Sequence, residues 1–415
     1  MLSTKLLDYL ILIAHDQQTL EAARIKENSF TRKREMSFPE ALSFLLDMRK
    51  TTLQTRLNLF FDSVKGGTPI SQQAFSKLRM NFNHSPFEIM LRGLVKQEYS
   101  GSYELPRWNN LHVLAVDGSY LQLPMAPDLT AEYGIRGGGE RPSAGISVLY
   151  DVLHGWALDP IITRTDMNER VECEKHIDFL WQQLPHIAEN SIVLLDRGYP
   201  SLALLKKLQM SGLKFLARCN SMFVSEINTA PIGDSVVRLK NGISIRVIKF
   251  ILPGGEMEVL ATNHFDIPES EFPRLYSLRW GIETSYFRLK RELCVEKFSG
   301  KTPNSIRQDF WASMVLLNSV AVFQKEADIA VLKRQACSSK PTKYVNRART
   351  SDLIITLRDR FIFANLCGHP LLAAAETKTI IKAISRSVST VRPGRSFPRH
   401  PAPYQAANFN LKSHL

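Results

Sequence analysis

The order of apolar segments between residues 111 and 219 restricts the possible folds more than any other feature of the sequence. Runs that favour strands occur at 111–124, 145–164, 191–196 and 213–219, and helical patterns separate the later runs. Strands that alternate with helices are typical of a mixed α/β sheet. We therefore predict three strands, then a helix, a strand, a second helix and a further strand.

Two turn signals divide the first part of this core. Asp117-Gly118 is the strongest kind of short hairpin signal, and His154-Gly155 marks a second turn. Helices are expected at about 170–184 and over the segment that follows Pro200. This order of elements matches the arrangement of ribonuclease H.

The regions on either side of the core have a different pattern of apolar residues. Apolar residues at helical spacing dominate the N-terminal part, and short strand-like pieces with turns but no helix follow the core strands. The last 34 residues, from Lys382, contain six Lys or Arg and no acid, which predicts a flexible basic tail. The predicted domains are a helical DNA-binding domain (1–105), a ribonuclease H-like core (106–217), a β insertion (218–270), the second part of the core with the catalytic helix (271–370), and the basic tail (371–415).

One short helix in the N-terminal region has the composition of a DNA-reading element. In "SQQAFSKLRM" Ser71 is a typical N-cap, and Phe75 and Leu78 are expected to point inward. Lys77 and Arg79, with Gln72, Gln73 and Ser76, would then face outward, as base and phosphate contacts do in a recognition helix. An ordinary solvated helix face is an equally good interpretation of this pattern.

The charge balance narrows the class of partner. The 415-residue chain carries a formal net charge of +13, which indicates an extended polyanion such as DNA or RNA; the alternative is a solvated basic surface. Its five cysteines lie far apart, which argues against a zinc site or disulfide framework and favours a reducing cytoplasm. The apolar run "YLILIA" is far too short to span a membrane.

The segment from 276 to 293 reads as one helix crowded with cations. At 100° per residue, one stripe roughly 60° wide contains Tyr276, Arg279, Glu283 and Lys290. The neighbouring stripe is apolar and should pack on the sheet; it contains Leu278, Ile282, Leu289 and Leu293. Trp280 falls outside the polar stripe, so packing is favoured for it over base stacking.

Three carboxylates are expected to converge. Asp117 and Asp196 each end an apolar strand, and Glu283 would lie beside the sheet. Close carboxylates raise each other's pKa unless cations compensate, and oxygen ligands select Mg²⁺ or Mn²⁺. Taken one by one, the three acids also fit simpler roles as a turn residue, a helix cap and an ion-pair partner of Arg279. Their joint occurrence with the basic charge favours a metal site.

These residues closely resemble a known family. The spacing of Tyr276, Arg279, Glu283 and Lys290 is similar to the Tyr-Arg-Glu-Lys signature of bacterial insertion-sequence DDE transposases, the cut-and-paste group named after insertion sequence four. "AVDGSYLQLP" and "IVLLDRGYPSLALLKKLQMSGLKFLAR" resemble its two aspartate segments. The likeness covers about residues 105–300 well, and the flanking regions only in general character.

The resemblance implies a fold, an activity and a site. Asp117, Asp196 and Glu283 would bind two Mg²⁺ ions, with Mn²⁺ as a substitute, for nicking, hairpin formation, hairpin opening and strand transfer. Phosphate contacts would come from Tyr276, Arg279 and Lys290, and more weakly from Arg197. The partners would be terminal inverted repeats and target DNA, bound by a homodimer in a bacterial cytoplasm at the nucleoid.

Three alternatives remain open. Another ribonuclease H-fold endonuclease would share the carboxylates without requiring the spaced Tyr, Arg and Lys. A catalytically silent, transposase-derived DNA-binding repressor would be favoured by loss of an acid, and all three acids are present. A membrane-surface protein is a distant third, because no basic amphipathic helix with a large apolar face stands out.

Overall fold

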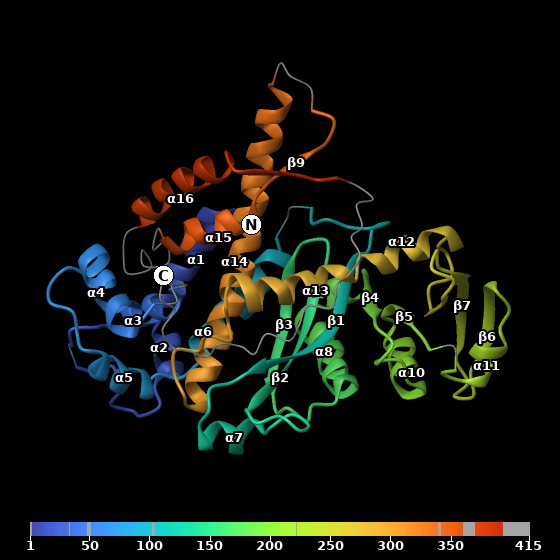
Figure 1. Cartoon of the computed structure of the whole chain (residues 1–415), viewed down its shortest axis with the longest axis horizontal. Helices are drawn as coiled ribbons and strands as arrows, with labels where there is room; N and C mark the ends of the chain where they lie inside the picture. The colour runs from blue at the N-terminus through green and yellow to red at the C-terminus, as the bar shows by residue number, and fades with distance from the viewer. Residues whose placement is uncertain are drawn as a thin grey trace. The chain divides into compact units, whose positions relative to one another are not determined.

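A computed structural model of the chain describes residues 2–32, 34–47, 51–101, 104–220, 222–338, 342–359 and 370–392. The chain separates into two compact units (Figure 1). The first unit comprises residues 1–94, 123–129 and 288–415, and the second comprises 95–122 and 130–287. Within the described ranges, no helix is long and apolar enough to cross a membrane.

The second unit is built on one eight-stranded sheet with the order β3-β2-β1-β4-β5-β8-β7-β6. β2 pairs antiparallel with both β1 and β3, whereas β4 is parallel to β1 and β5 is parallel to β4. This confirms the predicted ribonuclease H-like order of the core strands. The strands are β1 (His112–Gln122), β2 (Ser143–Asp151), β3 (Trp156–Thr163), β4 (Ser191–Leu195), β5 (Lys214–Arg218), β6 (Gly233–Arg238), β7 (Ser244–Ile251) and β8 (Met257–Thr262).

The core helices of this unit form where the apolar pattern predicts them. Helix α8 (Glu169–Gln183) packs on the sheet, where its fully buried His176 hydrogen-bonds Asp159 of β3 at 2.6 Å and Ser147 of β2 at 2.9 Å. These bonds fix α8 against two neighbouring strands. The other helices of the unit are α9 (Pro185–Ala188), α10 (Leu202–Ser211), α11 (Ser225–Thr229), α12 (Phe272–Ser277) and α13 (Trp280–Phe287), with a 3₁₀ turn, η2, at Glu269–Glu271.

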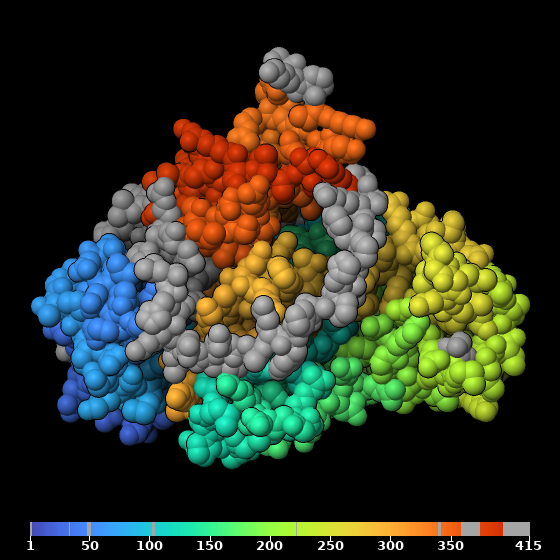
Figure 2. Space-filling model, viewed as in Figure 1, coloured from blue at the N-terminus to red at the C-terminus, as the bar shows by residue number. Residues whose placement is uncertain are grey.

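The predicted β insertion is present as an extension of the same sheet. β8 pairs antiparallel with β5, and β7 and β6 follow it to the edge. In the space-filling view the segments from β6 to α12, green to yellow, form one continuous surface (Figure 2). The prediction that this region contains no helix is wrong, because α11 lies between β5 and β6.

The first unit is predominantly helical, which confirms the prediction for the N-terminal region. Its long helix α14 contacts α1, α3 and α5, and the aromatic side chains Phe44, Phe60 and Phe75 are fully or almost fully buried. The residues of helices α6 (Ser85–Tyr99) and α7 (Pro127–Tyr133) are divided between the two units. The remaining elements are α1 (Ser3–Ala14), α2 (Gln17–Ala23), α3 (Phe38–Leu45), α4 (Leu53–Phe60), η1 (Phe61–Lys65), α5 (Gln72–Met80), η3 (Arg288–Glu292), α14 (Pro303–Ala336), β9 (Asn346–Ala348), α15 (Thr350–Asp359), α16 (Pro370–Ile384) and β10 (Val388–Thr390).

The C-terminal prediction needs correction. The segment assigned to a tail from residue 371 begins inside α16 and continues into β10, which pairs with β9. Hydrogen bonds and strand pairing therefore order this part of the chain. The rest of the predicted tail, residues 393–415, lies outside the described residues.

Two further predictions about local structure are wrong. Asp117-Gly118 is not a hairpin turn but the middle of β1, because antiparallel pairing with β2 continues without a break as far as Gln122. The segment 276–293 is not one helix. It divides at Leu278 and Arg279, where the N–H of Arg279 bonds the carbonyl of Tyr276 three residues back, and it ends in the π-helical segment η3.

Candidate active site

Asp117 and Asp196 are brought together by the register of two parallel strands. The last recorded pair of β1 and β4 is Ala115 with Leu194, so two residues further along the aspartates lie next to each other. Asp196 follows the end of β4 directly, whereas Asp117 continues within β1. Neighbouring strands are roughly 4.8 Å apart, and this edge is where α/β sheets bind ligands.

Glu283 comes to the same edge on helix α13. Ile282 is fully buried, and the hydroxyl of Tyr286 donates to the carbonyl oxygen of Asp117 at 2.6 Å, which ties the helix to β1. Gly281 lies against Val152, where an added Cβ would come within 3.0 Å. Close packing and this hydrogen bond therefore position Glu283, although its own helix is only eight residues long.

The guanidinium group of Arg279 joins the three carboxylates. Its Nη2 lies 2.7 Å from Glu283 Oε1 and 3.5 Å from Asp196 Oδ2, and its Nη1 lies 3.9 Å from Asp117 Oδ2. Arg279 is only 6% exposed, whereas the acids are partly open to solvent. One buried cation therefore lies within 4 Å of all three carboxylates.

Burial and neighbouring charges both shift the pKa values of Asp117 and Arg279. Burial raises the pKa of Asp117 to about 6, although Arg279 and the N–H of Gly118 act in the opposite direction. Burial alone would lower the pKa of Arg279, but the charges of Asp196, Tyr276, Asp117 and Glu283 outweigh it and raise that pKa. The site thus holds its arginine charged while one of its acids resists ionisation.

The donor set fits a hard divalent cation, although its present arrangement does not. Among the described residues, no three Asp, Glu, His or Cys side chains are arranged to hold a metal ion. The guanidinium of Arg279 lies within 4 Å of all three carboxylates and supplies positive charge there. All the available ligands are carboxylate oxygens, which suit Mg²⁺ or Mn²⁺.

The residues predicted to bind phosphate have different surroundings. The hydroxyl of Tyr276 donates to Asp196 Oδ1 at 3.2 Å, and Arg197 is exposed with its Nη2 3.9 Å from Glu258. Lys290 lies in η3 of the first unit, so its place beside the carboxylates stays a prediction. Trp280 is 47% exposed, so packing accounts for only part of its surface.

Helix α5 was predicted to be a recognition helix. Its N-cap is the predicted residue, and some of its side chains face the predicted way. Ser71 accepts from the N–H of Ala74, Phe75 is buried, and Lys77 is exposed. The outward orientation predicted for Arg79 is wrong. Arg79 is 7% exposed because α14 and the residues before it supply acceptors for its guanidinium: Ser299, Ser305, Gln308 and Asp309. Arg79 is therefore withdrawn as a DNA contact.

The sequence alone did not single out Glu169, which also lies at this edge. It is the first residue of α8, and its charge contributes to the raised pKa of Asp117. The only available signal was its place at the start of the helix after the third strand, where an acid is equally expected for helix stability.

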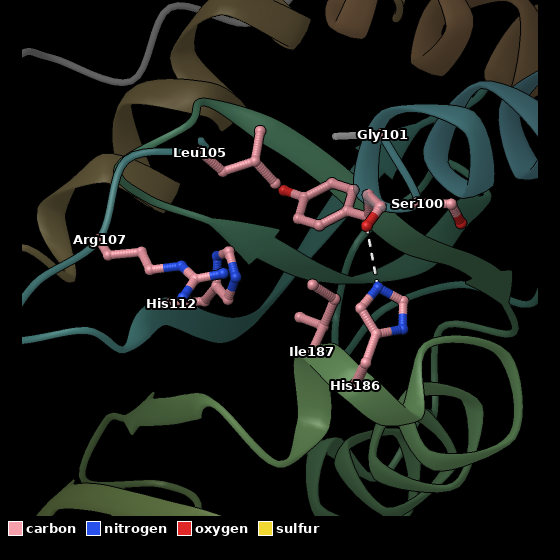
Figure 3. Close-up of a pocket in the computed structure, with 8 residues that line it drawn as sticks. Ser100, Gly101, Leu105, Arg107, His112, His186 and Ile187 are labelled. Carbon is pink, nitrogen blue, oxygen red and sulfur yellow. Dashed lines mark hydrogen bonds between the residues drawn. The ribbon is translucent and has the colours of Figure 1, made fainter. Parts of the chain in front are cut away.

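A separate pocket of about 440 Å³ lies at the opposite end of β1 (Figure 3). Arg107 and His112 both line this pocket, and the dashed line is the hydrogen bond from His186 Nε2 to the carbonyl oxygen of Tyr99, 2.8 Å long. His112 is fully buried, with Nδ1 3.8 Å from Asp151 Oδ2. None of the predicted site residues lines this pocket.

Comparison with known proteins places this geometry in a family. Residues 109–319, half of the chain, match the model of the transposase DDE domain. The transposase InsG of insertion sequence element IS4 from Escherichia coli K12 is 24% identical over 239 residues, which cover 52% of each chain. InsZ, classed provisionally as a transposase of the same organism, is 25% identical over 164 residues, or 39% of this chain and 54% of its own.

A likeness in fold extends further along the chain than the likeness in sequence. A piggyBac transposase, solved in a synaptic complex with hairpin DNA, superposes with a TM-score of 0.50 and 13% identity over 93% of this chain and 86% of its own. The chain spans about half the length of the curated relatives that it matches. Since the family model covers all three carboxylates and half of the sequence, the chain belongs to the DDE transposase family.

Proposed function

We propose that the chain is a transposase that moves an insertion sequence by metal-dependent cut-and-paste transposition. The observation that carries the proposal is the convergence of Asp117, Asp196 and Glu283 on one buried arginine, inside the region that matches the family. The transposase relatives and the solved transposase support DNA as the substrate. The basic net charge of +13 fits the same partner.

The proposed chemistry is a series of in-line displacements at phosphorus. Water first cuts one strand at the end of the element, and the freed 3′-hydroxyl attacks the opposite strand to close a hairpin. Water opens the hairpin, and the 3′-hydroxyl then attacks target DNA. In each step one P–O bond forms and one breaks, so no covalent bond to the protein is needed. The hairpin DNA bound to the solved transposase supports this sequence.

The proposed cofactor is a pair of Mg²⁺ ions, with Mn²⁺ as a substitute, held by Asp117, Asp196 and Glu283. When bound, such ions neutralise charge at the reacting phosphate and make water a stronger nucleophile at neutral pH. Arg279 would then be released from the acids it now pairs with and could bind a phosphate. Tyr276, which is hydrogen-bonded to Asp196, and Arg197, the next residue in the chain, would orient the same DNA strand.

The remaining proposed contacts concern the bound DNA as a whole. Lys77 on the exposed face of α5 would contact phosphate, and Lys290 would do so close to the scissile bond. Two ends must be held together for transposition, so we expect a homodimer on DNA. The synaptic complex of the solved transposase supports this arrangement.

The decisive experiment incubates the purified chain with DNA that carries the terminal repeats flanking its own gene. Wild type should nick these ends only when Mg²⁺ or Mn²⁺ is added. Glu283→Gln should reduce the rate by at least about 10³-fold, the scale seen when a unit of catalytic groups loses a member. Thr284→Ser, an exposed neighbour on α13, is the matched control and should cleave like wild type.

The outcomes separate the competing functions. If Glu283→Gln cleaves as fast as wild type, the catalytic assignment is wrong. Binding without cleavage by either protein favours the repressor. Cleavage of unrelated duplexes at the same rate, without joining to target DNA, favours a general endonuclease of the same fold.

A further inference from the structure

We propose that the pocket at the start of β1 binds one phosphate group, through the ring of His112 and the guanidinium of Arg107. The inference goes beyond the proposed function, because this pocket is separate from the three carboxylates. His112 and Asp117 are five residues apart on β1, which is roughly 17 Å in an extended strand. A phosphate bound here is therefore not the reacting one.

The pocket is formed within the second unit alone. Its about 440 Å³ are lined by the last residue of α6, the segment that leads to β1, the first residue of β1 and helix α9. The bond from His186 to the carbonyl oxygen of Tyr99 joins α9 to α6, and the N–H of His112 donates to the carbonyl oxygen of Asn190 at 2.8 Å. A volume of this size falls in the usual range of small-molecule sites.

The ring of His112 is a buried polar group without a partner. Its side chain is fully buried, and neither ring nitrogen has a hydrogen-bond partner among the described residues. The distance of 3.8 Å from Nδ1 to Asp151 Oδ2 is too long for a hydrogen bond. An imidazole carries at least one N–H, and leaving it unbonded in the interior costs free energy that an acceptor in the pocket would offset.

Asp151 is already bonded by other groups. Its Oδ1 accepts from the N–H groups of Leu153 and His154, and its Oδ2 accepts from the hydroxyl of Tyr99 at 2.9 Å. A move of this carboxylate towards His112 would break these bonds. The rings of Tyr99 and His112 pack beside each other with centroids 6.1 Å apart, so the imidazole is also held from the Tyr99 side.

The other lining residues favour an anion as the ligand. Arg107 is exposed and forms no hydrogen bond or ion pair within the described ranges. The pocket contains a second histidine, His186, and no Asp or Glu lines it. A phosphate has several acceptor oxygens, so that it can bond Arg107 and His112 at once, and the arginine fork matches its geometry.

Two sources share this chemistry, the backbone of DNA and free phosphate, and the test has an arm for each. The first arm measures binding of radiolabelled inorganic phosphate to the full chain by equilibrium dialysis, without divalent ions and at constant ionic strength. Arg107→Gln and His112→Leu should each weaken binding roughly tenfold or more, the scale for loss of a hydrogen bond to a charged group. Arg238→Gln, at an exposed position on β6 of the same unit, is the matched control and should stay within about twofold of wild type.

The second arm titrates the same proteins with a DNA duplex at several salt concentrations. If the DNA backbone supplies the phosphate, both pocket variants should weaken duplex binding, and Arg107→Gln should reduce the salt slope by about one unit. If free phosphate is the ligand, duplex binding should equal that of wild type while dialysis shows the loss. Neither arm measures cleavage, so the result is independent of the proposed function.

Two outcomes of these arms would overturn the inference. The first is that neither variant changes phosphate or duplex binding, which would place any bound phosphate elsewhere. The second is that Arg107→Gln alone weakens DNA binding while His112→Leu behaves like wild type in both arms, which would make Arg107 an ordinary surface contact.

The stability of His112→Leu gives a separate check on the unpaired ring. Replacing a buried polar group that has no partner by an apolar one of similar size should leave the melting temperature without phosphate equal or higher. A marked decrease, or failure to fold, would mean that the protein itself satisfies the ring, and the inference would fall.

Discussion

Two buried arginines, one in each unit, have opposite surroundings. Arg79 of α5 donates to Gln308 at 2.6 Å, to Ser299 at 2.7 Å and to Asp309 at 2.8 Å, so one acid and several neutral acceptors match its guanidinium. Arg279 lies within 4 Å of three carboxylates instead. Both side chains are almost completely buried.

This difference teaches how to separate a structural arginine from a functional one. A guanidinium whose donors meet matched, fixed acceptors gains nothing by leaving them, since an unpaired buried charge is costly. A guanidinium shared by three acids cannot bond all of them closely, and carboxylate oxygens are the ligands that hard divalent ions prefer. Arg79 should therefore stabilise the first unit, whereas divalent ions should be able to displace Arg279 from the carboxylates.

The largest expected effect comes from removing the guanidinium of Arg79, which tests its structural role. Arg79→Leu should destabilise the first unit by roughly 3–5 kcal/mol, because Asp309 loses its cation in a buried setting. Urea denaturation followed by circular dichroism measures this, and 10 mM Mg²⁺ should not restore the loss. Recovery by Mg²⁺ would contradict a purely structural role.

Removal of the Arg279 guanidinium should cause a smaller loss of stability, and added metal ions should reverse that loss. Arg279→Gln should destabilise the metal-free second unit by about 1–3 kcal/mol, since solvent screens Asp196 and Glu283 in part. Mg²⁺ should restore the stability, and Mn²⁺ should bind more tightly than in wild type. Melting curves with and without Mg²⁺ test this, and weaker Mn²⁺ binding would argue against exchange.

The protonation of Asp117 makes the stability of the Arg279 site depend on pH, which gives a further test. Its folded-state pKa of about 6 exceeds the ordinary 3.8, so the stability gained from the bound proton is complete below pH 3.8 and is lost as pH rises to about 6. Asp117→Asn should therefore be more stable than wild type by about 1–2 kcal/mol at pH 7.5 without metal, within the roughly 3 kcal/mol that the shift allows. At pH 3.5 the two should be equal, and a gain independent of pH would refute the assignment.

The smallest expected effect on stability comes from replacing two lysines, Lys77 and Lys290. Lys77→Ala, two residues from Arg79 on the same helix, should change stability by less than about 0.5 kcal/mol. It should weaken DNA binding and reduce the slope of log affinity against log salt by about one unit, and Lys290→Ala should do the same. Titrations at several salt concentrations measure the slope; an unchanged slope would remove that lysine from the DNA contacts.

Much of the second unit could be predicted because local pattern and tertiary structure agree there. The apolar runs at β4 and β5 are buried on both faces, and α10 between them buries Leu204, Leu205 and Leu208, so the apolar spacing in the sequence agrees with the burial. The three acids could be singled out because they end apolar runs or interrupt a basic helix.

The failures have a common physical cause, which is dependence on residues far away in sequence. Asp117-Gly118 has the composition of a turn, but pairing with β2 keeps it extended, and its glycine makes room for Glu169. Arg79 fits an outward position by helical spacing until α14 offers it acceptors. Neither Glu169 nor the break at Leu278 has a local signal that outweighs an ordinary helix.

The pairing of Ala115 with Leu194 has a consequence for how this centre can change over evolution and during a reaction. Main-chain hydrogen bonds set the gap between the two aspartates, so the gap survives wholesale replacement of core side chains, whereas a slip by one residue would turn one aspartate to the opposite face. Glu283 stands on a short, separate helix. Adjustment to successive DNA geometries should therefore fall to the glutamate, with the aspartates as the unmoving reference.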